Sequence, residues 1–108
     1  MIEEDPSTAF DHDAIDDVIH GRVRLAAVAY LASVESAEFT ILRRVVNATD
    51  GNLSVHLRKL EDAGYVAVDK RFVGRKPQTV YALTPAGREA FRRYVERLAG
   101  LLGTEKPR

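Results

Sequence analysis

The chain has 108 residues, of which 45% are hydrophobic and 30% charged, a composition typical of one small globular domain. It contains no cysteine, which excludes disulfides, thiolate metal sites and thiol redox switches. No apolar run is long enough to cross a bilayer and the acidic start is unlike a signal peptide, so we expect a cytoplasmic protein with no membrane partner.

The formal net charge is zero, but the charges are segregated along the chain. Residues 1–20 hold seven acidic residues and no Lys or Arg, whereas the remainder holds all 16 basic residues and nine acidic ones. A basic body of this kind can bind phosphates even when the whole chain is neutral. We expect residues 1–11 to be an acidic mobile arm, residues 12–103 to form the folded domain and residues 104–108 to be a tail.

A short helix is expected over residues 12–20. One of its faces carries Asp13, Asp16, Asp17 and His20 at the spacing of metal ligands on a helix. The alternative is a solvated acidic face with one histidine packed at a helix junction. We favour the alternative and expect no metal and no other cofactor.

Residues 22–34 predict a helix that is apolar on two faces. One stripe includes Val23, Ala27 and Tyr30, and a second includes Leu25 and Val28. A helix of this kind must be covered on both sides. Because the domain is small, we expect a second subunit to supply one of the covers.

A polar turn at 35–38 precedes a short helix that runs to Asn47, with Thr40 as its expected cap and with Arg43 and Arg44 facing outward. A longer helix is predicted from Thr49 or Asp50 to a stop at Gly64. Two close helices joined by a tight connection form a helix-turn-helix.

The longer helix has two distinct faces. Leu53, Leu57 and Leu60 form an apolar seam that requires a core, while a mostly polar face has no partner evident in the sequence. This second face consists of Asn52, Val55, His56 and Lys59. It suits either a DNA major groove or, in the simpler interpretation, solvent.

Residues 65–73 and 78–83 predict the two strands of a hairpin, and residues 74–77 its turn. Basic residues gather at or near its tip: Lys70, Arg71, Arg75 and Lys76. A charged hairpin tip can simply be solvated, but after a helix-turn-helix it is better interpreted as a wing that contacts phosphates or the minor groove.

Thr84 and Pro85 predict the cap and first position of a last helix that ends near Leu102. Its apolar residues recur at spacings of three and four, as in a coiled-coil seam. They are Phe91, Tyr94, Val95, Leu98, Leu101 and Leu102. The seam could pack on its own domain, but the helix is long for that purpose and we favour a partner.

These elements predict a mainly α domain with a β-hairpin (α+β): a winged helix-turn-helix with long N- and C-terminal dimerisation helices. The chain resembles the small prokaryotic winged-helix transcriptional regulators of the MarR/ArsR-like kind. The resemblance rests on several motifs together, and it spans residues 15–95. They are Ile19-His20-Gly21-Arg22-Val23-Arg24-Leu25, Phe39-Thr40-Ile41-Leu42-Arg43, Thr49-Asp50-Gly51-Asn52-Leu53-Ser54-Val55-His56-Leu57, Leu60-Glu61-Asp62-Ala63-Gly64-Tyr65-Val66, Gly74-Arg75-Lys76-Pro77 with Thr79, and Leu83-Thr84-Pro85-Ala86-Gly87-Arg88.

The resemblance implies a dimer that binds double-stranded DNA with residues 50–63 in the major groove. It also implies a phosphate contact supported by Ser54 and a minor-groove contact by Arg75. Three features depart from the family pattern. Val55 stands where a polar or basic residue is common, the cysteine ligands of metal-sensing relatives are absent, and so is the helical extension that forms an effector pocket in larger relatives.

We therefore expect a homodimeric transcription regulator, most simply a repressor of a palindromic operator, with no effector identified. The alternative is a winged-helix module that binds an acidic protein. No nucleophile–base pair or phosphate-binding glycine loop supports an enzyme. The expected DNA-binding residues are Thr40, Arg43, Arg44, Asp50, Gly51, Asn52, Ser54, Val55, His56, Lys59, Arg75, Lys76 and Thr79. The expected dimer interface contains Val23, Ala27, Tyr30, Phe91, Tyr94, Val95, Leu98, Leu101 and Leu102.

Overall fold

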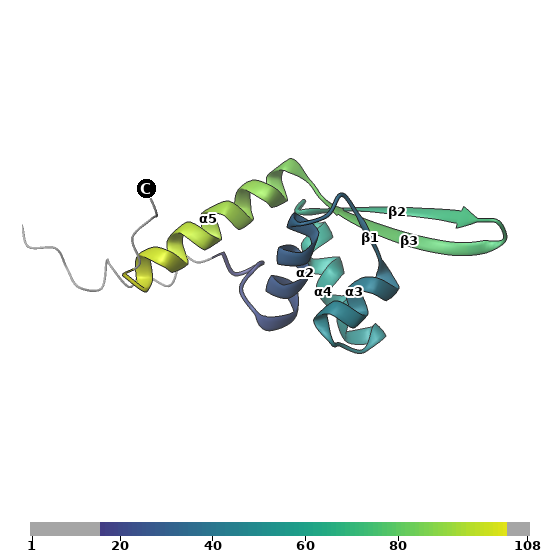
Figure 1. The fold of residues 1–108 in the computed structure, drawn as a ribbon, viewed down its shortest axis with the longest axis horizontal. Helices are drawn as coiled ribbons and strands as arrows, with labels where there is room; N and C mark the ends of the chain where they lie inside the picture. Colours follow the sequence, from purple (N-terminus) through teal and green to yellow (C-terminus); the bar gives the residue numbers. More distant parts are fainter. Residues whose placement is uncertain (1–15, 104–108) are drawn as a thin grey trace, which may run out of the picture.

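The computed structural model describes residues 16–103, so the expected arm and tail, together with Asp13, lie outside the described residues. The described elements are, in chain order, α2 (Arg22–Ala32), β1 (Ala37–Glu38), α3 (Phe39–Val46), α4 (Asp50–Asp62), β2 (Val66–Val73), β3 (Lys76–Leu83) and α5 (Pro85–Leu101). Helices α2, α3 and α4 form a central body, from which the β2–β3 hairpin and α5 extend in opposite directions (Figure 1). The predicted α+β winged helix-turn-helix is confirmed.

The core lies between α2, α3, α4 and the base of the hairpin. Leu31, Leu42, Leu53 and Leu60 are fully buried there. Burial of an aliphatic side chain of this size contributes about 1.5–3 kcal/mol, so the leucine seam of α4 is a main anchor of the fold. That seam fixes which face of α4 turns away from the body.

Val23 and Ala27 of α2 are covered by their own protomer, so the expectation that a second subunit covers these two residues is wrong. Val23 is 6% exposed and Ala27 is fully buried, because α3, α4, α5 and β3 all pack around this helix. The two residues therefore offer no surface to a partner. Tyr30 is partly buried against the same core.

The segment before α2 is a turn, so the helix expected over residues 12–20 is wrong for the part that the structure describes. The Asp16 carboxylate explains the difference, because its Oδ1 accepts hydrogen bonds from the backbone N–H groups of Val18 (2.8 Å) and Ile19 (3.3 Å). Side-chain hydrogen bonds of this kind compete with helical ones and favour turns. Ile19 is fully buried and fastens the turn to the body.

A short strand, β1, occupies part of the predicted polar turn at 35–38. It pairs with β3 through Ala37 opposite Tyr81 and Glu38 opposite Val80, which gives a three-stranded antiparallel sheet in the order β1-β3-β2. This pairing holds Glu38 extended, so Glu38 is the N-cap of α3 and Thr40 lies within the helix. The prediction of Thr40 as the cap was wrong.

The hairpin turn is shorter than the predicted 74–77. Val73 pairs with Lys76, which leaves Gly74 and Arg75 as a two-residue turn, and Gly74 has a φ of 65°. Two-residue hairpin turns require positive φ, which glycine adopts without strain. Pro77 lies in β3 opposite Phe72. Strand β1 pairs only with Val80 and Tyr81 of β3, so the N–H group that Pro77 lacks is not needed for pairing with β1.

Candidate nucleic-acid interface

Helix α4 begins and ends where its sequence predicts. The Thr49 side chain accepts a hydrogen bond from the backbone N–H of Asn52 at 3.2 Å, and Gly64 has a φ of 81° just past the helix end. Between these residues, the buried leucine seam turns Asn52, Val55 and Lys59 toward solvent. The Val55 side chain is 56% exposed. These three residues therefore lie on one solvent-exposed side of α4, as the sequence predicts.

His56 differs from its neighbours on that face because it turns toward α2. The guanidinium Nη1 of Arg24 lies 3.5 Å from its Nδ1, and the residue is half-buried. Burial, and then the positive charges of Arg24, Lys59 and Arg22, lower the pKa of His56. Each of these effects favours the neutral imidazole.

Sequence reasoning did not include Arg22 and Arg24 in the interface. The sequence does contain one signal. Two basic residues in the first turn of α2 are unfavourable with the helix dipole, which suggests that they are placed there for an interaction outside the helix. Their closeness to α4 depends on tertiary packing, which the periodicity of either helix alone does not show. These two residues extend the basic charge beside the exposed face of α4.

Two of the predicted DNA-binding residues pair with each other. Arg43 Nε on α3 lies 2.9 Å from Asp50 Oδ1 at the start of α4. An exposed ion pair adds little stability, but this one offsets an acidic charge that would otherwise repel phosphate. Arg44 is exposed and has no ion pair with any residue in 16–103.

The hairpin presents its basic residues to solvent. Arg71 pairs with Asp69, whereas neither Arg75 nor Lys76 forms an ion pair within the described part of the chain. Phe72 and Val73, next to the tip, are 73% and 58% exposed. Sequence reasoning had counted these two as ordinary strand residues. Exposed apolar side chains beside an unpaired arginine suit contact with deoxyribose and base edges in a minor groove.

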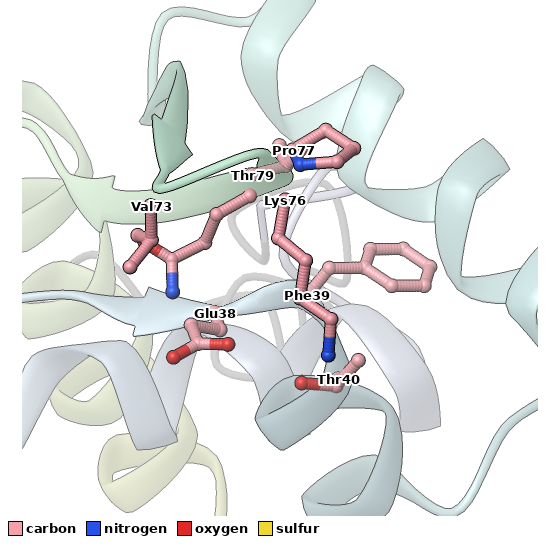
Figure 2. A pocket seen from close by; sticks show the side chains of 8 residues that line it. Glu38, Phe39, Thr40, Val73, Lys76, Pro77 and Thr79 are labelled. Atoms are coloured by element: carbon pink, nitrogen blue, oxygen red, sulfur yellow. The ribbon is translucent and has the colours of Figure 1, made fainter.

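A cleft of about 640 Å³ separates the hairpin from the start of α3. Three predicted DNA-binding residues, Thr40, Lys76 and Thr79, line it together. Figure 2 shows the Lys76 side chain extending from its strand toward the side of the cleft that Thr40 occupies. A cation and a hydroxyl group that converge from two elements are suited to contact a phosphate, and the exposed carboxylate of Glu38 also lines the cleft.

The remaining predicted residues of the interface lie at the start of α4. Gly51 and Ser54 are exposed, and a Cβ built on Gly51 would meet nothing within 4 Å. An open glycine at this point allows close approach of another backbone. On β3, by contrast, Thr79 is half-buried, because it forms part of the wall of the cleft described above.

Two of the residues singled out as alternative metal ligands, Asp16 and His20, have other partners. The Asp16 carboxylate accepts a hydrogen bond from the Tyr65 hydroxyl at 2.6 Å, and His20 Nδ1 lies 3.0 Å from the Tyr94 hydroxyl. Among residues 16–103, no group of three His, Asp or Glu side chains could hold a metal ion. The two hydrogen bonds instead fasten the turn before α2 to the C-terminal half of the domain.

Helix α5 carries an exposed apolar surface. Val95 is 49% exposed and Leu102 is 73% exposed, while Tyr94 is buried at 4% and so faces its own domain. Phe91, Leu98 and Leu101 are half-buried. A groove of about 380 Å³ lies between α5 and the end of α2, lined in part by Ala32, Phe91 and Val95. No helix in residues 16–103 is long and apolar enough to span a membrane.

Comparison with known proteins decides the family. The family model described as a winged helix DNA-binding domain matches residues 23–102. The chain belongs to this family. This winged-helix chain is 37% identical to an uncharacterized protein of Methanocaldococcus jannaschii over 78 aligned residues. The aligned residues are 72% of this chain and 85% of that relative.

Solved structures agree with this assignment. The transcriptional regulator homologue protein from Pyrococcus horikoshii OT3 has a TM-score of 0.80 and 27% identity, over 89% of this chain and 95% of that one. A putative MarR-family regulator from Enterococcus faecalis has a TM-score of 0.66 and 25% identity, over 92% and 86% of the two chains. The resemblance to MarR-like regulators is confirmed. The winged-helix chain is a DNA-binding transcription regulator and not an enzyme.

Proposed function

We propose that the protein is a homodimeric repressor that binds a palindromic operator, with α4 in the major groove and the β2–β3 hairpin as a wing on the flanking backbone. The observation that carries this proposal is the exposed face of α4 (Asn52, Val55 and Lys59), together with basic residues of the hairpin that have no acidic partner in residues 16–103. Polar side chains of this size reach base edges in a major groove. Because DNA is the partner, we place the protein in the cytoplasm.

The cleft between α3 and the hairpin supports a division of labour. Thr40 and Lys76 would hold one phosphate there, while Arg75 at the tip would reach the next stretch of backbone or the minor groove. Contacts of this kind position a protein on DNA without reading its sequence. Asn52 on α4 would then supply sequence preference.

The exposed apolar residues of α5 support pairing of two copies. The surface comprises the exposed Val95 and Leu102 and the half-buried Leu98 and Leu101, together with the groove beside Phe91. Two-fold pairing would present two α4 helices to half-sites about one helical turn of DNA apart, roughly 34–36 Å. A dimer bound across a promoter would block access to that DNA, which is why we propose a repressor.

Selection of bound duplexes from a random pool tests the proposal directly. An enriched inverted repeat supports both sequence-specific binding and dimerisation. Loss of every sequence during selection would contradict the proposal and favour the alternative of a winged-helix module that binds an acidic protein.

Two substitutions separate base reading from backbone contact. Asn52→Ala should cost about 1–3 kcal/mol per half-site on the operator and relax preference at one base position, with non-specific affinity nearly unchanged. Arg75→Ala should instead weaken binding to many sequences and reduce the salt-dependence slope by about 0.9 for each phosphate that the protein no longer neutralises. Affinities for operator and scrambled duplexes are measured at several salt concentrations.

Arg97→Ala is the matched control for Arg75→Ala, because it removes an exposed arginine from α5, away from the proposed DNA contacts, and sedimentation checks that this variant still pairs. It should leave the salt slope unchanged. Equal reductions in affinity for both duplexes with Asn52→Ala would show that α4 does not read the bases.

A further inference from the structure

The contact between Arg24 and His56 joins the first turn of α2 to the middle of α4. Arg24 Nη1 lies 3.5 Å from His56 Nδ1, while its Nη2 donates to the backbone carbonyl of Asp17 at 3.3 Å. The Nε atom of Arg24 is shielded from solvent and has no hydrogen-bond partner within residues 16–103. The guanidinium is therefore held between the turn before α2 and α4.

The contact with Arg24 favours one protonation pattern of the imidazole. A guanidinium only donates hydrogen bonds, so in this 3.5 Å contact His56 Nδ1 is the acceptor, and the tautomer that suits it has no proton on Nδ1. A neutral imidazole with an accepting Nδ1 carries its proton on Nε2. The charged side chains that face His56 are Arg22 and Arg24 from α2 and Lys59 from α4, all cationic, and together with burial they lower its pKa and disfavour the imidazolium.

The Nε2–H group is available for another contact. Within residues 16–103 it has no hydrogen-bond partner, and His56 is half-buried between the exposed residues Val55 and Lys59. On α4 it lies one turn after Asn52, along the side of the helix proposed to enter the groove.

We propose that Arg24 is a positioning residue that locks His56 in the Nε2–H tautomer, so that His56 acts as an obligate donor to an acceptor on a base edge. The proposal rests on the proposed function for the placement of α4 in the major groove. In that groove guanine (O6 and N7), adenine (N7) and thymine (O4) each offer an acceptor, whereas cytosine offers only a donor. His56 therefore selects against cytosine at the base it contacts, and guanine, with two adjacent acceptors, is the base to compare with it.

Removing Arg24 should relax this selection without removing the imidazole. With no donor at Nδ1, both tautomers become accessible, and Nε2 can then accept from cytosine as well as donate to guanine. Arg24→Met removes the donors while keeping an unbranched apolar stem in place of the inner part of the arginine side chain. Arg22→Met is the matched control, because it removes a cation from the same helical turn and leaves the hydrogen bond to His56 in place.

The tautomer is measured first, on the full chain without DNA. Long-range ¹H–¹⁵N correlation spectra distinguish Nε2–H from Nδ1–H imidazoles, and a His56→Gln spectrum assigns the signal among the three histidines. Wild type and Arg22→Met should show the Nε2–H pattern, and Arg24→Met a mixture. A backbone amide spectrum confirms that each variant is folded. An Nδ1–H imidazole in wild type, or an unchanged pattern in folded Arg24→Met, overturns the role of Arg24.

Base preference is measured second, on the operator obtained by selection. Wild type should prefer guanine to cytosine at the His56 position, and 7-deazaguanine there, which lacks the N7 acceptor, should weaken binding about two- to tenfold. His56→Leu should abolish this preference, Arg24→Met should reduce it and Arg22→Met should retain it. If an operator is found and none of its positions responds to His56→Leu, the inference fails while the proposed function stands. If no sequence is enriched, the proposed function and the base-reading role fail together, and the spectra still decide the tautomer.

Discussion

Gly87 is the position where a single methyl group should have the largest effect on the fold. It lies in the first turn of α5, directly against the backbone of Tyr65, and a Cβ placed on it would be 2.1 Å from the Tyr65 carbonyl oxygen. Because that neighbour is backbone rather than a flexible side chain, Gly87→Ala must displace α5 from the α4–β2 junction.

The same junction depends on Thr84. Its N–H donates to the Tyr65 carbonyl at 3.0 Å, its hydroxyl donates to the Gly64 carbonyl at 2.6 Å, and the same hydroxyl accepts from the Gly87 N–H at 3.0 Å. Overpacking costs about 1–3 kcal/mol and loss of the cap about 1 kcal/mol, so we expect Gly87→Ala to lower the free energy of unfolding by about 2–4 kcal/mol. The thermal midpoint should fall by roughly 10–30 °C.

Gly100→Ala is the matched control, because it makes the same change in the same helix at a site with nothing within 4 Å of the added Cβ. There the lower helix propensity of glycine predicts a gain of about 0.5–1 kcal/mol. Circular dichroism during urea and thermal unfolding measures both variants. Stabilisation by Gly87→Ala similar to that by Gly100→Ala would refute the close approach of α5 to Tyr65.

Three further predictions concern the other contacts of the domain. The hydrogen bond to the Asp16 carboxylate and, as a smaller effect, burial raise the pKa of Tyr65 to about 12. The folded state therefore retains a proton that the unfolded state loses near pH 10. The free energy of unfolding should therefore fall as pH rises from about 10 to 12, and the Tyr65→Phe variant, followed by urea unfolding, should lose this part of the pH dependence and about 1–2 kcal/mol at pH 7. Val95→Glu should leave a folded monomer where wild type sediments as a dimer, and a wild-type monomer at tens of micromolar would contradict the proposed pairing. Deletion of residues 1–11 should raise the affinity for arbitrary DNA at low salt, and an unchanged affinity would exclude competition between the acidic segment and phosphate.

The sequence by itself determined the order of the elements from α2 to α5, except for β1, and most of the exposed face of α4. Thr49 and Thr84 cap their helices as predicted, because a cap acts between residues three apart in the chain. The leucine seam of α4 is buried as predicted, because helical periodicity alone places Leu53, Leu57 and Leu60 on one side. These signals are local, so no knowledge of the rest of the fold was needed.

Tertiary packing decided which of the apolar faces are already covered. The stripe of Val23 and Ala27 on α2 has the composition of an interface, yet four other elements of the protomer enclose it. Pairing of β1 with β3 likewise moved the start of α3 to the residue after Glu38. Periodicity shows that an apolar face of a helix must be buried, but it does not show whether the same protomer or a partner buries it.

Tertiary packing also decided the partners of the polar residues. Asp16 and His20 have metal-ligand spacing in the sequence, and the fold brings them to tyrosines that lie 49 and 74 positions away, respectively. The contact of Arg24 with His56 spans 32 positions, and it places a guanidinium 3.5 Å from the imidazole of a residue on the predicted groove face. Hydrogen bonds form between atoms within about 3.5 Å, and for residues this far apart in the chain only the packing of helices and strands sets that distance.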